Sequence, residues 1–122
     1  MIRSCAFFML AALGGCRPAA AVTIDSSNDV HCSALAFQYA KFAEADPAAT
    51  PRQKQALKQT FDWYSAKVRE AAIERNDPER LIRESGPALK AAQSDPAAMR
   101  AHVYACAERA SADPAFRAQL AR

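Results

Sequence analysis

Apolar residues recur at helical spacing along most of the chain beyond residue 30. Leu57, Phe61, Tyr64, Val68 and Ala72 follow one another at intervals of four, three, four and four residues, which places them on one side of a helix. The same kind of stripe runs through two further segments: Cys32, Leu35, Tyr39 and Phe42, and Met99, Val103, Cys106 and Ala110. No segment shows the strict polar–apolar alternation of a half-buried strand. The chain is therefore predicted to be all-α.

Pairs that end in proline mark the predicted helix starts. Asp-Pro occurs at 46–47, 77–78, 95–96 and 113–114, and Thr-Pro occurs at 50–51. Asp or Thr at an N-cap accepts hydrogen bonds from the amides of the first turn, and proline at the next position loses nothing because its missing N–H would have had no partner. Each pair therefore predicts a helix start, and Thr50 with Gln53 adds a capping-box pattern. The predicted helices span about 30–45, 51–75, 78–93, 96–111 and 114–121.

The third predicted helix carries Ser85-Gly86-Pro87 in its interior. Proline there removes a backbone donor and its ring clashes with the preceding turn, so this helix is predicted to kink or split. The expected fold is a small bundle of about four to five helices. Residues 22–122 have the length of a single domain, so no second domain is expected.

Residues 1–21 have the layout of a secretory signal peptide. Arg3 supplies a short positive start, an uncharged apolar run extends from Cys5 to Leu13, and a Gly-Gly pair precedes the small residues that follow. The apolar run is too short to cross the core of a bilayer, which needs about 20 residues. We therefore expect an exported protein, periplasmic or secreted, whose leader is removed.

Two cleavage sites compete within this leader. Ala19-Ala20-Ala21 before Val22 satisfies the small-residue rule of signal peptidase, whereas Leu13-Gly14-Gly15-Cys16 has the form of a lipobox. Gly at the middle of that motif and Arg17 directly after it are less usual, so cleavage after Ala21 is favoured. Cleavage before Cys16 would instead give a lipoprotein, and contact with a membrane is expected only in that case.

The cysteines predict one disulfide. Cys5 and Cys16 lie in the leader region, while Cys32 and Cys106 lie in the body. An even pair in an exported chain is typical of a disulfide. A bond between Cys32 and Cys106 would close a loop of about 75 residues, to which the chain-entropy model assigns roughly 4 to 5 kcal/mol. Because both cysteines lie on core-facing stripes, the bond is expected to join the first predicted helix to the fourth.

The charge of the body argues against one class of partner. Arg3 and Arg17 belong to the leader region, so the 16 Lys and Arg residues less these two leave 14, against 13 Asp and Glu. A body with almost no net charge lacks the basic surface that phosphate binding requires. Nucleic acid is therefore not expected as a partner.

No catalytic constellation is recognisable, and no catalytic residue is nominated. Gly86 is the only glycine after the leader, so a glycine-rich phosphate loop is absent. No Ser, His and acid set has a recognisable nucleophile context, and the absence of a CxxCH motif excludes ordinary c-type haem attachment. We expect neither enzymatic activity nor a cofactor.

Each histidine of the body lies close to one of its cysteines. His31 directly precedes Cys32, and His102 lies one helical turn before Cys106. If the first and fourth helices pack together, two thiolates and two imidazoles could form a site for zinc or copper. Adjacent residues point about 100° apart on a helix, so joint coordination by His31 and Cys32 would need an unwound turn. A disulfide with two bystander histidines is therefore favoured over the metal site.

Two aromatic residues fall outside the apolar stripes. Phe37 lies nearly opposite Leu35, and Trp63 lies about 100° or more from the side that carries Phe61 and Tyr64. Coverage by a second helix is the simpler explanation for each of them. Otherwise Phe37 and Trp63 are apolar anchors of a surface for binding or self-association.

The expected function follows from these exclusions. A small exported helical protein without recognisable catalytic residues is expected to bind a protein or peptide partner in the cell envelope. A metal-binding protein that uses the Cys2His2 set is one alternative. A structural envelope protein anchored by a lipid on Cys16 is the other.

Overall fold

The computed structural model describes residues 23–121, which form five α-helices and no strand. The predicted leader, both cleavage sites and the lipidation residue Cys16 lie outside the described residues. The helices are α2 (Asp29–Ala45), α3 (Pro51–Arg75), α4 (Glu79–Ser94), α5 (Pro96–Ser111) and α6 (Pro114–Leu120). Within residues 23–121 no helix combines the length and apolar character needed to span a membrane. The all-helical prediction is confirmed, with boundaries within one residue of those expected.

Side-chain caps fix the helix starts. Asn28 accepts the amides of Val30 and His31 at the start of α2, and Thr50 with Gln53 forms the predicted capping box on α3. Asp95 accepts the amide of Ala98 at the start of α5, and Asp113 accepts that of Ala115 at the start of α6. The N-cap residue of α4 is Pro78, and Asp77 just before it accepts the amide of Arg80. Three of the four Asp-Pro pairs therefore lie at helix starts, as predicted.

The Asp46-Pro47 pair does not start a helix, which corrects the prediction at that position. Residues 46–49 form a turn in which the Asp46 carboxylate accepts the amide of Ala48 at 2.9 Å. A helix that began at Pro47 would carry Pro51 in its interior, where the ring would clash with the preceding turn. The chain therefore turns first and begins α3 at Pro51.

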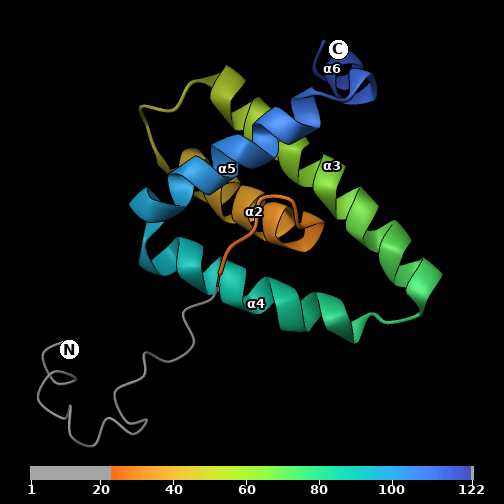
Figure 1. Cartoon of the computed structure of the whole chain (residues 1–122). Helices are drawn as coiled ribbons and strands as arrows, with labels where there is room; N and C mark the ends of the chain where they lie inside the picture. The colour runs from red at the N-terminus through yellow and green to blue at the C-terminus, as the bar shows by residue number, and fades with distance from the viewer. Residues whose placement is uncertain (1–22, 122) are drawn as a thin grey trace, which may run out of the picture.

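Helix α4 continues without a break through Ser85-Gly86-Pro87 (Figure 1). Of the two predicted outcomes, a kink or a split, the split is wrong. An interior proline costs a helix about 3 kcal/mol, but Ala88 directly after it and Ala92 one turn further on are fully buried. Packing of a buried side supplies most of the stability of helices in proteins, and here it holds α4 together across Pro87.

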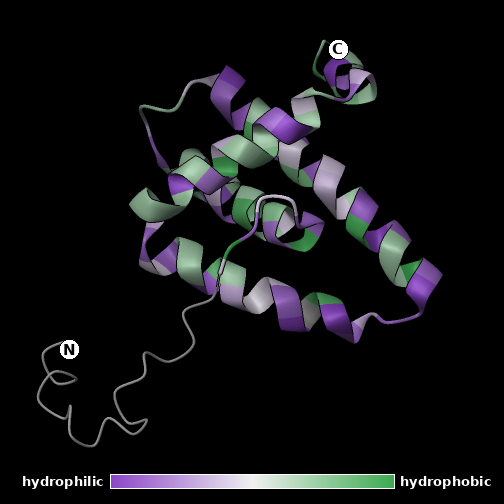
Figure 2. Ribbon diagram, viewed as in Figure 1, coloured by the Kyte–Doolittle hydropathy of each residue, from purple (hydrophilic) through white to green (hydrophobic). Residues whose placement is uncertain are grey.

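Helix α2 lies at the centre of the bundle (Figure 1). Helices α3 and α4 diverge from their connecting turn and flank α2, while α5 crosses α2 and α3 (Figure 1). The short α6 packs against α3 and α5. Figure 2 shows hydrophilic and hydrophobic residues interspersed along α3, as expected of a helix with one buried and one exposed side.

Two clusters of buried side chains form the core. The first joins α2, α4, α5 and the segment before α2: Ile24, Ala34, Leu35, Ala88, Ala92 and Val103. The second joins α2, α3, α5 and α6: Cys32, Tyr64, Cys106, Ala110 and Phe116. Helices α2 and α5 contribute to both clusters, so these two helices hold the bundle together.

The predicted pairing of the cysteines is confirmed. The sulfur atoms of Cys32 and Cys106 lie 2.10 Å apart and their Cα atoms 5.6 Å apart, which are disulfide distances. The pair joins α2 to α5, the first and fourth of the predicted helices. Arg109 reinforces this junction, because its guanidinium donates to the Ser26 carbonyl and to the Asp29 carboxylate, each at 2.9 Å.

Candidate functional site

Phe37 is exposed on α2, on the side opposite the buried Leu35. Its side chain retains 39% of its solvent exposure, whereas Leu35 retains none. The Phe37 ring contacts the ring of Phe61 on α3, with the ring centres 5.4 Å apart. Both rings line an apolar hollow between α2, α3 and α4, which we call the Phe37 groove.

The Phe37 groove has its floor on α2 and a wall on each flanking helix. The lining residues are Val30, Ser33, Ala34 and Phe37 on α2, Phe61, Ser65, Val68 and Arg69 on α3, and Leu81, Ser85 and Leu89 on α4. Residues three and four positions apart share one side of a helix, so each helix contributes a row of side chains to the groove. The enclosed volume is about 300 Å³.

Cationic side chains lie at the Phe37 groove. Arg69 is the only charged residue in its lining, and the Lys41 ammonium lies 5.2 Å from the centre of the Phe37 ring. Neither cation forms an ion pair within the described part of the chain. The groove therefore combines an apolar interior with two cations that other side chains do not neutralise directly.

Trp63 does not belong to this groove. It is half-buried on another side of α3, with its ring edge-on to Phe116 of α6 and the ring centres 5.5 Å apart. The Lys67 ammonium lies 4.9 Å from the centre of the Trp63 ring. Of the two predicted binding residues, the structure therefore places Phe37 in an exposed groove and Trp63 against α6.

The four residues of the alternative metal site do not come together as a set. Cys32 and Cys106 are fully buried at disulfide distance, while His31 Nδ1 accepts the amide of Asp25 at 3.1 Å. His102 is half-buried on α5. Among residues 23–121, no three or more His, Cys, Asp or Glu side chains lie close enough together to hold a metal ion.

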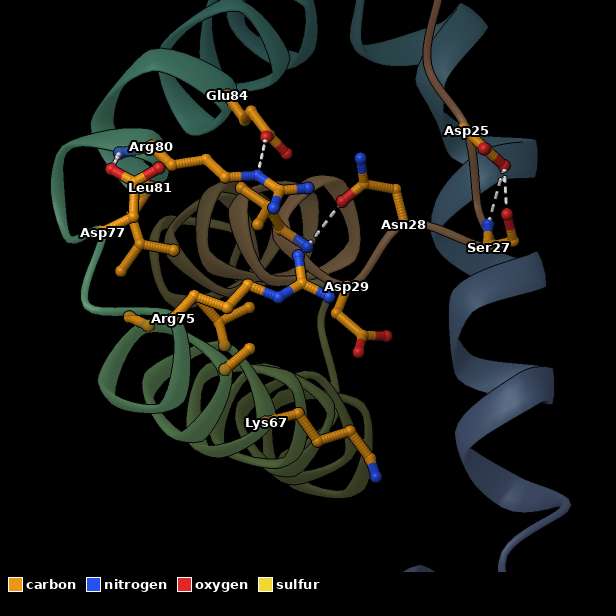
Figure 3. Close-up of a pocket in the computed structure, with 14 residues that line it drawn as sticks. Asp25, Ser27, Asn28, Asp29, Lys67, Arg75, Asp77, Arg80, Leu81 and Glu84 are labelled. Carbon is orange, nitrogen blue, oxygen red and sulfur yellow. Dashed lines mark hydrogen bonds and ion pairs between the residues drawn. The ribbon is translucent and has the colours of Figure 1, made fainter.

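A second hollow, the polar pocket, lies between the starts of α2 and α4 and the C-terminal half of α3 (Figure 3). It encloses about 270 Å³. Figure 3 shows the guanidinium groups of Arg75 and Arg80 reaching into it from α3 and α4. Arg80 is paired with Glu84, and Asp29 at the opposite edge is paired with Arg109 at 2.9 Å. Several charges of this pocket are therefore already neutralised by neighbouring side chains.

Two carboxyl groups of the polar pocket have lowered pKa values. The hydrogen bond from Arg80 is the main cause of the lowered pKa of Glu84. The side-chain and backbone hydrogen bonds from Ser27 are the main causes of the lowered pKa of Asp25. A general acid at neutral pH needs a raised pKa. Glu84 and Asp25 are therefore arranged as permanent anions, which suits pairing with cations rather than proton transfer.

Most residues of the Phe37 groove are not evident from the sequence. The apolar pattern places Phe61 and Val68 on one core-facing stripe and assigns no role to Leu81 or Leu89. One signal is present, because α2 carries apolar residues on the side of Leu35 and also on the side of Phe37. A helix that is apolar all round is normally covered on more than one side.

No family model, curated protein or solved structure gave a significant match to this chain.

Proposed function

We propose that this protein is an exported, non-enzymatic binding protein of the cell envelope, and that it holds an amphipathic helix of a partner protein in the Phe37 groove. The observation that carries the proposal is the exposed ring of Phe37 on the floor of an apolar hollow. Exposed apolar surfaces rimmed by polar residues are typical of sites for protein interaction. Aromatic residues are also enriched in the buried centres of such interfaces.

The shape of the groove fits a helix. Its three rows of side chains come from α2 and from the two helices that flank it (Figure 1). An amphipathic helix lays residues at i, i+3, i+4 and i+7 into a groove of this kind. A peptide that binds by strand addition would instead need the edge of a sheet, and residues 23–121 contain no strand. A docked helix would cover the Phe37 side of α2, opposite the side on which Leu35 packs in the core.

The charge of the groove indicates the polar side of the partner helix. Arg69 and Lys41 lie at the groove without an ion-pair partner in the described residues. Acidic residues beside the apolar stripe of the partner would complement both cations. Charges at the rim of an interface act mainly on the association rate and on specificity. Phe37 is therefore expected to supply more of the affinity than either cation.

Two features support export. The leader has the positive start, apolar run and small residues of a signal peptide. Cys32 and Cys106 lie at disulfide distance, and disulfides form and persist in oxidising compartments outside the cytosol. The partner helix is accordingly assigned to another protein of the envelope.

A designed peptide tests the groove. The probe is an amphipathic helix with leucines at i, i+3, i+4 and i+7 and glutamates beside them, and a second peptide carries lysines in place of the glutamates. In fluorescence anisotropy, we expect the protein to bind the acidic peptide more tightly than the basic one, because Arg69 and Lys41 repel the lysines. Phe37→Ser should weaken binding of the acidic peptide by more than about 1 kcal/mol, as loss of a significant interface residue does.

Tyr104→Ser is the matched control for this substitution. Tyr104 is another exposed aromatic residue, and it lies outside the groove, so its loss should leave peptide binding unchanged. Equal binding of the two peptides, or equal effects of the two substitutions, would rule out the proposed groove. If the free protein sediments as a dimer that Phe37→Ser dissociates, the occupant is a second copy of the chain instead.

The intact mass of the exported protein tests the leader. We expect the mass of residues 22–122, less the hydrogens lost when the disulfide forms. A mass that begins at Cys16 and includes acyl chains would identify the lipid-anchored alternative. Recovery of the full chain from the cytosol, with none exported, would contradict the proposal of an envelope protein.

A further inference from the structure

A third hollow lies between the C-terminal half of α2, the N-terminal half of α3 and α5. It shares no lining residue with the Phe37 groove. Its volume of about 380 Å³ falls within the range of about 300 to 1,000 Å³ that is typical of small-molecule sites. We call it the alanine cavity after four of its lining residues: Ala43, Ala49, Ala56 and Ala107. Alanine at these positions leaves space that larger side chains would fill.

The interior of the alanine cavity is apolar. Phe42, Leu57 and Val103 add larger apolar surfaces to the alanines. Val103 is 2% exposed and belongs to the first core cluster, so this part of the cavity wall is fixed by the packing of the bundle. Small-molecule sites are mostly apolar, with a few polar groups that orient the ligand. The lining therefore suits the hydrocarbon part of a ligand.

The polar groups around the cavity fall into two classes. Four of them already have partners in the protein: Tyr39 donates to the Pro96 carbonyl, Asp46 accepts from the Ala48 amide, Gln53 accepts from the Thr50 amide and Thr60 donates to the Ala56 carbonyl. Arg100 and Tyr104 are the others, and neither side chain has an ion-pair or hydrogen-bond partner among residues 23–121. These two lie one turn apart on the same side of α5.

We propose that the alanine cavity binds a medium-chain aliphatic carboxylate, with its hydrocarbon chain among the alanines and its carboxylate at Arg100 and Tyr104. A guanidinium presents N–H donors in a fork that matches the two oxygens of a carboxylate. The Tyr104 side chain is 62% exposed, so its hydroxyl is available as a further donor. This site goes beyond the helix-binding function and does not depend on it.

Tyr39 and Asp46 also line the cavity, but both already have hydrogen-bond partners in the protein. Arg100 and Tyr104 are therefore the groups available to bind the anion. Burial is the main cause of the raised pKa of Tyr39, so its hydroxyl remains protonated and keeps its bond to the Pro96 carbonyl. Asp46 is the other charged residue of the lining, and the Ala48 amide already binds its carboxylate at 2.9 Å. A cationic ligand would have Asp46 as its only charged partner in the cavity. The decisive measurement is therefore whether the cavity binds an anionic head group more tightly than a cationic one.

Three probes with the same hydrocarbon chain test the head group. Octanoate, octanol and octylammonium are titrated into the exported protein by calorimetry, below the concentrations at which they form micelles. We expect octanoate to bind most tightly, octanol more weakly and octylammonium least. In amide NMR spectra, octanoate should shift the signals of Tyr104 and Ala107 and leave the signal of Phe37 unchanged.

Substitutions separate the head group from the chain. Arg100→Gln should weaken octanoate roughly three- to tenfold and leave octanol unchanged, as expected for loss of a charged donor at an exposed position. Arg75→Gln is the matched control, because Arg75 is an exposed arginine that lines the polar pocket, and it should change neither affinity. Ala107→Leu should abolish binding of both probes by filling the cavity. Tyr104→Phe removes only an exposed hydroxyl, so this variant should fold. If the leucine variant does not fold, Tyr104→Phe still tests the site, because loss of the hydroxyl should weaken octanoate and leave octanol unchanged.

The outcomes that contradict the site are equally specific. Preference for octylammonium would overturn the proposal and assign the head group to Asp46. Equal binding of all three probes would show apolar adsorption without recognition of a carboxylate. Shifts centred on Phe37 would place the ligand in the groove instead, and absence of octanoate binding in the millimolar range would exclude the site.

Discussion

Removal of the disulfide by Cys32→Ala and Cys106→Ala together is expected to lower the free energy of unfolding by about 2 to 5 kcal/mol. The two cysteines are 74 positions apart. For a loop of that length the chain-entropy model gives roughly 4 to 5 kcal/mol, which native strain reduces. Urea unfolding of the wild type and of the double variant, with and without reductant, measures the difference.

The reductant serves as the control for this prediction. It should bring the wild type to the stability of the double variant and leave the variant unchanged. Alanine is preferred to serine here, because both positions are fully buried and an unpaired hydroxyl would add its own cost. If the wild type unfolds at the same urea concentration in both conditions, the disulfide does not stabilise the fold.

Tyr64→Ala is expected to lower the free energy of unfolding by about 3 to 5 kcal/mol, the usual cost of deleting a large buried aromatic side chain. Tyr64 is fully buried beside the cysteines, and its hydroxyl donates to the Cys106 carbonyl at 2.5 Å. The Arg109 guanidinium lies 4.8 Å from the centre of its ring. The substitution therefore removes packing between α3 and α5 together with a hydrogen bond that joins them.

A conservative substitution at Tyr64 and a matched control at Tyr104 show which part of this effect comes from packing. Tyr64→Phe keeps the ring and loses the hydrogen bond, so it should cost only about 0.5 to 1.5 kcal/mol. Tyr104→Ala removes an exposed ring and should change stability by no more than about 0.5 kcal/mol. Thermal or urea unfolding of the three variants shows which substitution lowers the free energy of unfolding most. Similar losses for Tyr64→Ala and Tyr104→Ala would contradict the position of Tyr64 in the core.

The helix boundaries could be predicted because their signals are local. Asp95 and Asp113 each act through an amide of the following turn, so a few adjacent residues contain the whole interaction. Asp46 shows the limit of this reasoning, because the proline at position 51 disfavours the helix that Asp46 would otherwise start, and no buried side is described there to offset that cost. The cysteine pairing could also be predicted from the sequence, because Cys32 and Cys106 both lie on apolar stripes that had to face the core.

The groove and the alanine cavity could not be predicted, because they depend on how several helices are placed. Phe61 and Tyr64 lie on one stripe of α3, yet Phe61 is only half-buried and lines the groove while Tyr64 is fully buried in the core. Phe37 and Trp63 both depart from their stripes, and each ring contacts an aromatic ring of another helix, yet Phe37 stays exposed while Trp63 is half-buried. The apolar periodicity identifies such residues as unusual, but it does not show whether another helix covers them.

Helix α6 lies outside the covalent loop that Cys32 and Cys106 close, since it begins at Pro114. A helix of seven residues is too short to be stable alone, so it depends on the docking of Phe116, which is 2% exposed. Local opening of a short terminal segment requires less free energy than global unfolding. Detachment of α6 would take Phe116 away from the cluster around the disulfide. Because Phe116 packs in the cluster that contains both cysteines, we expect opening of α6 to be the first local motion that lets external thiols approach this bond.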